Sequence, residues 1–347
     1  MRLQVHLVFA VVLALLSAAI VRAMIRVGTL DHPGARSSHT QPTPKGGGVG
    51  IVAAFVFGMV VLFATAGRAR VPDLPFVGLI AAAVGIAAIS YADDVRNFSF
   101  PVKLAAQLGA ALVAIACGIR LHDLHLPWLG TWNTGWMGVP LTAAWILFVT
   151  NAVNFIDGLN GLASGSVAIA CLVLAGFGWV QGDWFVHVAA LALAAGILGF
   201  LPFNFPHARI FMGDVGSQFC GFVIAVLGVL AAGFGAQTLS VLLVPMLLMG
   251  ILFDVAFTLA RRVATGQAVT QAHRSHLYQV AHRAGVSAPA ISLIYWGMTA
   301  WGGLCAIGFS AASSPNKPFV PLAVFVPQAL WLGFVVRRAH GAKLHRW

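Results

Sequence analysis

The chain contains 347 residues, of which 60% are hydrophobic and only 8% are charged, and its formal net charge at pH 7 is +11. This composition excludes an ordinary soluble domain, in which roughly a quarter of the residues carry a charge. All nine acidic residues are aspartates. In so apolar a chain, each of these carboxylates is a candidate for a specific role.

Continuous apolar runs of about 20 residues recur along the chain, each long enough to cross a hydrocarbon layer of roughly 30 Å. Because the runs are continuously apolar rather than alternating, they predict helices and not the strands of a β-barrel. Eleven runs can be distinguished, at 3–24, 47–66, 76–92, 101–119, 138–156, 161–180, 184–203, 216–234, 238–260, 288–311 and 319–336. The predicted fold class is all-α: a polytopic integral membrane protein with about 11 transmembrane helices in a single domain over residues 1–347.

Two features of these runs favour plain structural interpretations. The first run follows a single Arg2 and has no convincing small-residue cleavage site, so it is interpreted as a retained helix rather than a signal peptide. The four cysteines lie inside predicted helices without metal-ligand spacing, so they are interpreted as small apolar fillers: Cys117, Cys171, Cys220 and Cys305.

The 20 lysines and arginines are distributed unevenly between the two sides of the membrane. With loops numbered by the helix they follow, the even-numbered side keeps only Arg2, Arg68, Arg70, Arg120 and Lys317. The other basic residues lie in odd-numbered loops, at the adjoining helix ends and in the C-terminal tail. The positive-inside rule therefore puts the odd loops and the C-terminus in the cytoplasm and the N-terminus outside. The basic excess reflects topology and attraction to anionic lipid, so no nucleic-acid partner is expected.

The polar segments whose side chains could take part in a reaction all fall on the predicted cytoplasmic side. They are "DHPGARSSHTQPTPKGGG" in loop one, "ADDVRN" in loop three, "NFIDGLNG" in loop five, "NFPHARIFMGDVGS" in loop seven and "RRVATGQAVTQAHRSHLYQVAHRAG" in loop nine. On the other side, the Trp- and His-rich segment 120–136 is typical of interfacial anchoring, and His6 and His187 are interpreted as structural.

Four aspartates from three of these loops, Asp93, Asp94, Asp157 and Asp214, form the main candidate site. Each alone is explained as a solvated residue at a helix end. Together, clustered carboxylates repel one another unless a cation or a proton lies between them. Hard oxygen ligands suit Mg²⁺ or Mn²⁺, and magnesium is commonly shared between carboxylates and substrate phosphates. The set therefore predicts metal-assisted chemistry on a phosphorylated substrate.

Glycines and histidines near these carboxylates add weaker signals. Gly213 and Gly216 surround Asp214 just before a predicted helix, where backbone N–H groups could approach an anion, although ordinary turn chemistry explains this too. His273 and His276 flank Arg274, and on a helix the two histidines would share a face. Phosphate contact is preferred over zinc ligation because no cysteine is near, with a solvated loop as the alternative.

Three of the polar segments carry a family likeness. "ADDVRNFSFPVKLAAQ", "NAVNFIDGLNGLASG" and "FNFPHARIFMGDVGSQFCGF" resemble, in order and spacing, the signature segments of the polyprenyl-phosphate N-acetylhexosamine-1-phosphate transferases. The resemblance covers about residues 25–285. It implies ten or eleven helices, a cytoplasmic active site in a bacterial inner membrane, and sugar-1-phosphate transfer from a UDP-N-acetylhexosamine to undecaprenyl or another polyprenyl phosphate.

The resemblance also implies roles for individual residues. The catalytic residues implied are Asp93, Asp94 and Asp157, of which the adjacent pair is implicated in activating the lipid phosphate. Asp214 matches the Mg²⁺ ligand and Asn154 the asparagine that can join it, while Lys103 matches a phosphate-contacting lysine. Phe211 falls where an aromatic ring can stack on uracil, and the loop-nine segment His273, Arg274 and His276 is assigned to substrate binding. Oligomeric state is left open between monomer and homodimer.

One departure concerns the sugar. The muramoyl-pentapeptide transferases of this superfamily carry a triple-histidine stretch in loop nine, where this chain has "HRSH". The segment is more similar to the branch that initiates O-antigen or related cell-envelope glycans, sometimes on 6-deoxy sugars. The sequence-level alternative from another class is a multi-helix transporter, which is disfavoured because transporters place polar groups near the midplane in related halves.

Overall fold

The computed structural model describes residues 3–31, 41–65, 72–126, 130–233, 239–268, 273–312 and 317–344. The fold is a bundle of helices with two small antiparallel strand pairs. The helices are α1 (Leu3–Val27), α2 (Gly48–Thr65), α3 (Asp73–Arg96), α4 (Phe100–Ala116), α5 (Gly138–Ile156), α6 (Leu162–Gln181), α7 (Trp184–Phe200), α8 (Gly213–Gly233), α9 (Leu243–Leu247), α10 (Met249–Ala264), α11 (Leu277–Arg283), α12 (Ala288–Ala311) and α13 (Phe325–Gly341). Short 3₁₀ segments precede α5, follow α7 and precede α13, at Gly135–Met137, Leu201–Phe203 and Lys317–Val324.

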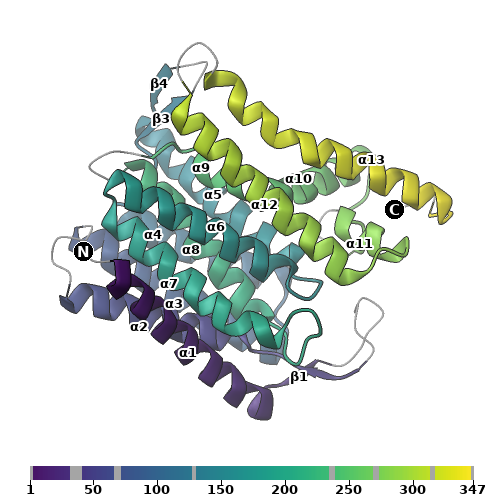
Figure 1. The fold of residues 1–347 in the computed structure, drawn as a ribbon, viewed down its shortest axis with the longest axis horizontal. Coiled ribbons are helices and arrows are strands. Elements are labelled where there is room, and N and C mark those ends of the chain that lie inside the picture. Colours follow the sequence, from purple (N-terminus) through teal and green to yellow (C-terminus); the bar gives the residue numbers. More distant parts are fainter. Residues whose placement is uncertain are drawn as a thin grey trace.

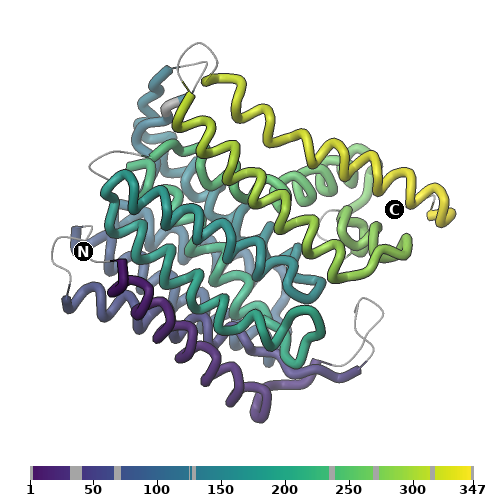
Figure 2. The backbone as a smooth tube through the Cα atoms, in the orientation of Figure 1, coloured from purple at the N-terminus to yellow at the C-terminus, as the bar shows by residue number. Residues whose placement is uncertain are grey.

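The long helices run side by side, with α8 at the centre and α1 and α13 at the periphery (Figures 1 and 2). The most apolar window of α8 is 94% buried, against 17% for α1. A helix that is apolar on all sides belongs in such a central position. In α1 the buried residues are His6, Leu13, Ser17 and Val21, spaced by seven, four and four positions, so only one stripe of this helix faces protein.

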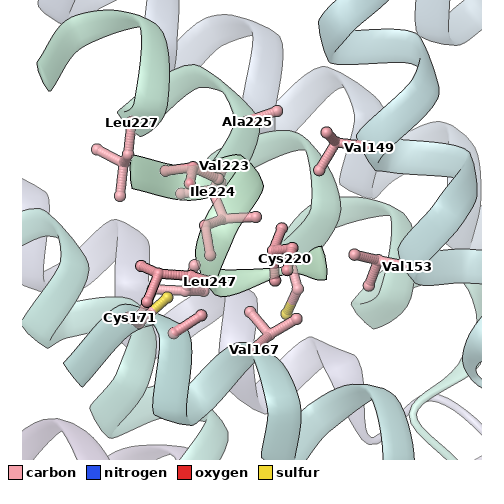
Figure 3. Close-up of a cluster of buried hydrophobic side chains, with 14 of the residues drawn as sticks. Val149, Val153, Val167, Cys171, Cys220, Val223, Ile224, Ala225, Leu227 and Leu247 are labelled. Carbon is pink, nitrogen blue, oxygen red and sulfur yellow. The ribbon is translucent and has the colours of Figure 1, made fainter. Parts of the chain in front are cut away.

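The core of the bundle is built from small and branched side chains. Figure 3 shows Cys220, Val223 and Ile224 of α8 among Val149 and Val153 of α5 and Val167 and Cys171 of α6. Both cysteines shown are fully buried with free thiols, which agrees with their interpretation as apolar fillers. Glycines permit close helix contacts: a Cβ added at Gly48 of α2 would come within 2.3 Å of the Gly216 backbone on α8.

Nine helices in the described part of the chain are long and apolar enough to cross a membrane. The all-α, multi-pass fold class is therefore confirmed, whereas the expected count of eleven is not. Two of the nine, α7 and α13, reach spanning length together with their adjoining 3₁₀ segments, whereas α4 has 17 residues alone and is not among the nine. The single run expected at 238–260 is divided, because α9 ends at Leu247 and α10 begins at Met249. The continuous helix predicted there is wrong: α9 is one short turn, and α10 carries Asp254 and, in its last turn, Arg261 and Arg262.

The two ends of the bundle differ in character. The β3 (Asp123–Leu126) and β4 (Gly130–Asn133) hairpin lies at one end, the end that also holds the N-terminus (Figure 1). The short pair β1 (Leu30–Asp31) and β2 (Thr43–Pro44), helix α11 and the C-terminus lie at the other. All the candidate site residues belong to this second end, as the arrangement of odd loops predicts. Five of the charges used for the topology lie outside the described residues: Arg2, Arg36, Arg68, Arg70 and Arg346.

Candidate active site

The adjacent aspartates at the end of α3 hold two different parts of the structure. Asp94 accepts hydrogen bonds from the backbone N–H groups of Asp214 and Val215, both at 3.1 Å, one on each carboxylate oxygen. The first N–H groups of a helix have no partner within the helix, so Asp94 caps α8 from a distant helix. Gly213 has φ of +75°, and a Cβ there would meet Asp94 Oδ2 at 2.6 Å. Only glycine allows this close approach.

Asp93 is engaged on the opposite side of the pair. Its Oδ1 accepts the N–H of Phe98 at 2.6 Å, and its Oδ2 forms an ion pair with Lys103. The Lys103 ammonium also lies 3.0 Å from Asp214 Oδ2. Lys103 therefore lies between two carboxylates and joins α3, α4 and α8 by charge-assisted contacts.

Amide side chains orient Asp214 further. Asn154 Nδ2 donates to Asp214 Oδ1 at 3.1 Å and to Ser217 Oγ at 2.9 Å. Gln218 Nε2 donates to Asp214 Oδ2 at 3.1 Å. The chain of hydrogen bonds continues inward, since Gln107 donates to Gln218 at 3.0 Å. Asp214 is thus fixed by α4, α5 and its own helix while its side chain stays 26% exposed.

The turn between α5 and α6 forms a second wall of the site. Asn204 accepts the Gly161 N–H at 2.7 Å and donates to the Ile210 carbonyl at 3.0 Å, which ties the turn to the segment before α8. From α12, Ser292 Oγ donates to the Asn160 carbonyl at 2.8 Å and Trp296 Nε1 to the Gly161 carbonyl at 2.9 Å. Asp157, at the start of this turn, is therefore carried on a firmly held backbone.

Loop one closes the site on a third side. The Phe211 N–H donates to the Pro44 carbonyl at 2.8 Å, and the Gly47 N–H donates to the Phe211 carbonyl at 2.9 Å. Lys45, between those contacts, lies 3.5 Å from an Asp31 carboxylate oxygen. This pairing brings a lysine from the first loop to the same place as the loop-seven residues.

These segments enclose a cavity of about 310 Å³. Its lining within the described residues is acidic and amide-rich: Asp31, Lys45, Asp94, Asn154, Asp157, Gly158, Leu159, Asn160, Asn204, Phe211, Met212, Gly213, Asp214 and Gln279. The volume falls at the small end of the range for ligand pockets, about 300–1,000 Å³. Asp93 and Lys103 support the cavity from behind without lining it.

Electrostatics distinguishes the carboxylate of Asp157. Burial raises the pKa of Asp157 well above its ordinary value, and the nearby charges of Asp214 and Asp94 raise it further. Both causes disfavour the charged form. A cation beside Asp157 would reverse the effect of the neighbouring carboxylates.

Loop nine is arranged differently from the expectation that its histidines share a helix face. Helix α11 begins only at Leu277, so His273 and His276 both precede it, although their rings still lie 5.0 Å apart. His276 is buried with its Nδ1 3.2 Å from Asp254 Oδ1, and Arg274 contributes its backbone carbonyl to Arg283. Burial lowers the pKa of His273 to about 4, with His276 and nearby arginines adding to the effect. His273 is thus neutral at pH 7.

The structure therefore brings together most of the predicted site and adds members to it. The residues that meet at the cavity or directly behind it are Asp93, Asp94, Lys103, Asn154, Asp157, Phe211 and Asp214. His273, Arg274 and His276 lie outside the cavity lining, and the described loop-nine residue that reaches the lining is Gln279. Whether the three contact substrate stays a prediction.

Five polar residues of the cavity lining were missed, among them Asp31, which opens the quoted loop-one segment. Lys45 was counted only as a topological charge, and the amides of Asn160, Asn204 and Gln279 carry no charge signal. For Asn160, its place in the quoted turn beside Asp157 was a usable signal.

The residues present fit a divalent metal that relies on substrate for part of its coordination. The described cavity lining holds four aspartates and one lysine. No group of three or more His, Cys or Asp side chains in the described parts of the chain is arranged to enclose a metal by itself. Magnesium is usually bound by one or two carboxylates together with substrate phosphates, so such a closed group is not required.

Comparison with known proteins places the chain. The family model described as Glycosyl transferase family 4 matches residues 76–232. The chain is 32% identical over 282 residues to the "Probable undecaprenyl-phosphate N-acetylglucosaminyl 1-phosphate transferase" of Bacillus subtilis, which covers 79% of this chain and 77% of that protein. The chain belongs to glycosyl transferase family 4.

Other members of glycosyl transferase family 4 show the same likeness. The "Decaprenyl-phosphate N-acetylglucosaminephosphotransferase" of Mycobacterium tuberculosis is 33% identical over 316 residues, 83% of this chain and 76% of the relative. The "Phospho-N-acetylmuramoyl-pentapeptide-transferase" of a Synechococcus strain is 32% identical over 210 residues, 59% of this chain and 60% of the relative. The family match covers the ends of α3, α5 and the start of α8, which carry Asp94, Asn154 and Asp214.

Proposed function

We propose that this chain transfers an N-acetylhexosamine-1-phosphate from a UDP-sugar to a polyprenyl phosphate, releasing UMP and forming a polyprenyl-diphospho-sugar. Relatives are named for transfer onto undecaprenyl or decaprenyl phosphate, which supports this reaction class. The observation that carries the proposal is the aspartate, lysine and amide cluster around a polar cavity at one end of an apolar helix bundle. A water-soluble donor can enter such a cavity while a lipid acceptor approaches from the bilayer.

Mg²⁺, or Mn²⁺ in its place, is the proposed cofactor, held by Asp214 with Asn154 assisting. Both substrates carry phosphates, and the described cavity wall has more aspartates than basic side chains. Anionic substrates would be repelled from such a wall without an added cation. When bound, the ion would neutralise phosphate charge during phosphoryl transfer.

Direct attack of the lipid phosphate on the β-phosphorus of the donor is the proposed route. A lipid phosphate oxygen forms the new P–O bond, the bond to the UMP oxygen breaks, and UMP leaves with the electron pair. The alternative uses an aspartyl-phosphate intermediate. Both oxygens of Asp94 accept backbone N–H groups, and Asp93 contacts a backbone N–H and Lys103, so both carboxylates hold the protein together, which favours direct attack over this alternative.

Roles of the remaining residues follow from position. Asp93 fixes Lys103, which provides positive charge beside Asp214. Phe211 lines the cavity, where its ring is proposed to stack on the uracil base, and Asp157 lines the same cavity. The basic and histidine residues His273, Arg274 and His276 are proposed to contact substrate phosphate at the edge of the site.

The donor sugar is proposed to be GlcNAc or a 6-deoxy N-acetylhexosamine, and the lipid to be undecaprenyl phosphate. The reaction then initiates O-antigen or another cell-envelope glycan from the cytoplasmic face of a bacterial inner membrane. UDP-MurNAc-pentapeptide is not expected as a donor, because loop nine lacks the triple histidine of the enzymes that use it.

The test uses purified protein in detergent with undecaprenyl phosphate, Mg²⁺ and a panel of UDP-N-acetylhexosamines. UMP release that depends on the lipid phosphate supports the proposal, and the panel identifies the sugar. Transport of a solute by vesicles with no UMP release from any donor would favour the transporter instead. A stoichiometric burst of UMP from donor alone, without lipid, would contradict direct attack.

A further inference from the structure

Another buried carboxylate, apart from those at the cavity, organises the part of the molecule that faces the cavity from loop nine. Asp254 lies on α10 and its side chain is almost completely buried, at 1% exposure. It stands in the middle of an otherwise apolar stretch, "GILFDVAFTLA", where an isolated charge would be costly. Such a residue persists when its oxygens are satisfied by hydrogen bonds.

Asp254 accepts hydrogen bonds from groups on three helices. The N–H groups of Leu277 and Tyr278 donate to its two oxygens at 2.8 and 3.1 Å, and His276 Nδ1 lies 3.2 Å from Oδ1. Tyr295 of α12 donates its hydroxyl to Oδ2, and Thr258 of the same helix α10 donates to Oδ1 at 3.2 Å. The carboxylate thus fixes where α11 begins and ties that point to α12.

Both partner helices touch the turn that carries Asp157. On α11, Tyr278 donates its hydroxyl to the Phe155 carbonyl at 3.0 Å, and a Cβ added at Gly158 would meet that hydroxyl at 2.2 Å. On α12, Ser292 and Trp296 donate to the same turn; they lie three residues before and one residue after Tyr295, which donates to Asp254. The next residue on α11, Gln279, lines the cavity.

We propose that Asp254 is a positioning residue of the transfer reaction: by fixing the start of α11 against α10 and α12, it places Gln279 and the Asp157 turn for binding of the nucleotide-sugar donor. This inference rests on the proposed function. Asp254 itself does not line the cavity, so it acts through the residues it holds. The donor, and not the lipid acceptor, is affected because the polar cavity wall moves while the Asp93–Lys103 side, built by α3 and α4, is untouched.

The main variant is Asp254→Asn, which keeps the shape but removes one acceptor and the charge. We expect KM for the UDP-sugar to rise by about tenfold or more, the factor for losing one hydrogen bond to a charged group. KM for polyprenyl phosphate and kcat at saturating donor should stay within about threefold of the wild-type values. A threefold change is well below the change expected for the loss of one hydrogen bond to a charged group. Thr258→Val is the matched control, since it removes a donor to the same carboxylate that does not involve α11, and its KM values should stay as in the wild type.

Amide hydrogen exchange provides a readout that does not depend on activity. In Asp254→Asn, peptides covering 273–283 should exchange faster than in the wild type, while peptides from α3 and α8 should not change. Unchanged exchange at 273–283, or an unchanged donor KM, overturns the proposal. An equal rise of both KM values also overturns it.

Two further outcomes are separable. If Asp254→Asn cannot be recovered folded, Tyr278→Phe replaces it, because this variant removes only the hydroxyl contact to Phe155. A raised donor KM with wild-type lipid KM in Tyr278→Phe supports positioning through α11, and an unchanged donor KM overturns it. If the wild type itself releases no UMP, the proposed function fails, and the exchange measurement alone decides whether Asp254 positions α11.

Discussion

Aspartates at this site act in two distinct ways. Asp94 and Asp254 are buried, and each accepts backbone N–H groups at the start of a helix other than its own. Asp157 and Asp214 are partly exposed and line the cavity, Asp214 with amide and lysine contacts. An ionised carboxylate has about four acceptor sites, so Asp254, with five contacts, is fully used by the protein, whereas Asp94 keeps acceptor capacity and also lines the cavity. At the scale of single residues, Asp254 builds the site, Asp94 both builds and lines it, and Asp157 and Asp214 are proposed to meet the ligand.

Replacing Asp214 by asparagine tests this division. Asp214→Asn should lower kcat for UMP release by about a hundredfold or more, since a charge that binds the proposed metal beside the phosphates is removed. Expression and insertion should remain normal because the partners Asn154 and Gln218 can still hydrogen-bond to an amide. Asp73→Asn, at an exposed position in the first turn of α3, is the control and should leave activity unchanged. Near-wild-type turnover of Asp214→Asn at ordinary Mg²⁺ would exclude it as the metal ligand.

The lowered pKa of His273 predicts a pH dependence of stability. In the folded protein the pKa of His273 is about 4, against 6.5 for an unperturbed histidine, so between these limits the unfolded state binds the proton more readily. The stability that depends on a neutral His273 is therefore fully present above about pH 6.5 and is lost as the pH falls toward 4.

The measurement is the melting temperature in detergent at pH 7.5 and pH 5, for the wild type and His273→Gln. The wild type should lose more stability on acidification than the variant, because glutamine does not titrate. The raised pKa of Asp157 acts in the opposite direction in both proteins and cancels in the comparison. Equal losses in the two proteins would show that His273 is protonated as readily when folded as when unfolded.

Among the helices, close approach of backbones sets the geometry of the site. Gly48, the first residue of α2, packs against Gly216 in the first turn of α8, the same turn that carries Asp214. The Gly48 N–H also donates to the Met212 carbonyl at 2.9 Å. A larger residue at this crossing would push the start of α8 away from loop one.

Gly48→Ala should therefore destabilise the protein by about 1–3 kcal/mol, the usual cost of overpacking. Gly109→Ala is the matched control: it lies within α4, a Cβ there meets nothing within 4 Å, and alanine favours a helix. Thermal unfolding in detergent followed by circular dichroism should show a lower midpoint only for Gly48→Ala. Equal midpoints for the two variants would mean that α2 and α8 can separate without cost.

The sequence allowed prediction of most helices and of five residues that line the cavity, but not of the contacts between helices; the five are Asp94, Asn154, Asp157, Phe211 and Asp214. Hydropathy identifies α2 and α8 because it depends on composition along a window. Hydropathy did not identify the break at Leu248, because the backbone leaves the helical conformation there inside a uniformly apolar stretch. Asp254 was missed for the same reason, since it was read as part of a membrane-spanning run. An aspartate inside such a run was the available signal.

For the molecule as a whole, the polar cavity lies at one end of the bundle axis only. The cavity, α11 and the C-terminus lie at one end, and the β3–β4 hairpin lies at the other, the end that also holds the N-terminus (Figure 1). Opposite ends for the two termini agree with an odd number of crossings. Nucleotide sugars are cytoplasmic molecules, so the proposed reaction requires the cavity end to face the cytoplasm.

Reporter fusions test this orientation directly. A reporter active only outside the cytoplasm should be active when inserted within 120–136, and inactive when fused after Trp347, while a cytoplasm-specific reporter should give the reverse pattern. The expectation follows from the excess of lysine and arginine at the cavity end, which the positive-inside rule retains in the cytoplasm. Adding basic residues to the 120–136 segment is the informative control, because it should weaken the preference without altering the cavity. An active external reporter after Trp347 would place Asp157 and Asp214 away from cytoplasmic donors, and would contradict both the orientation and the proposed reaction.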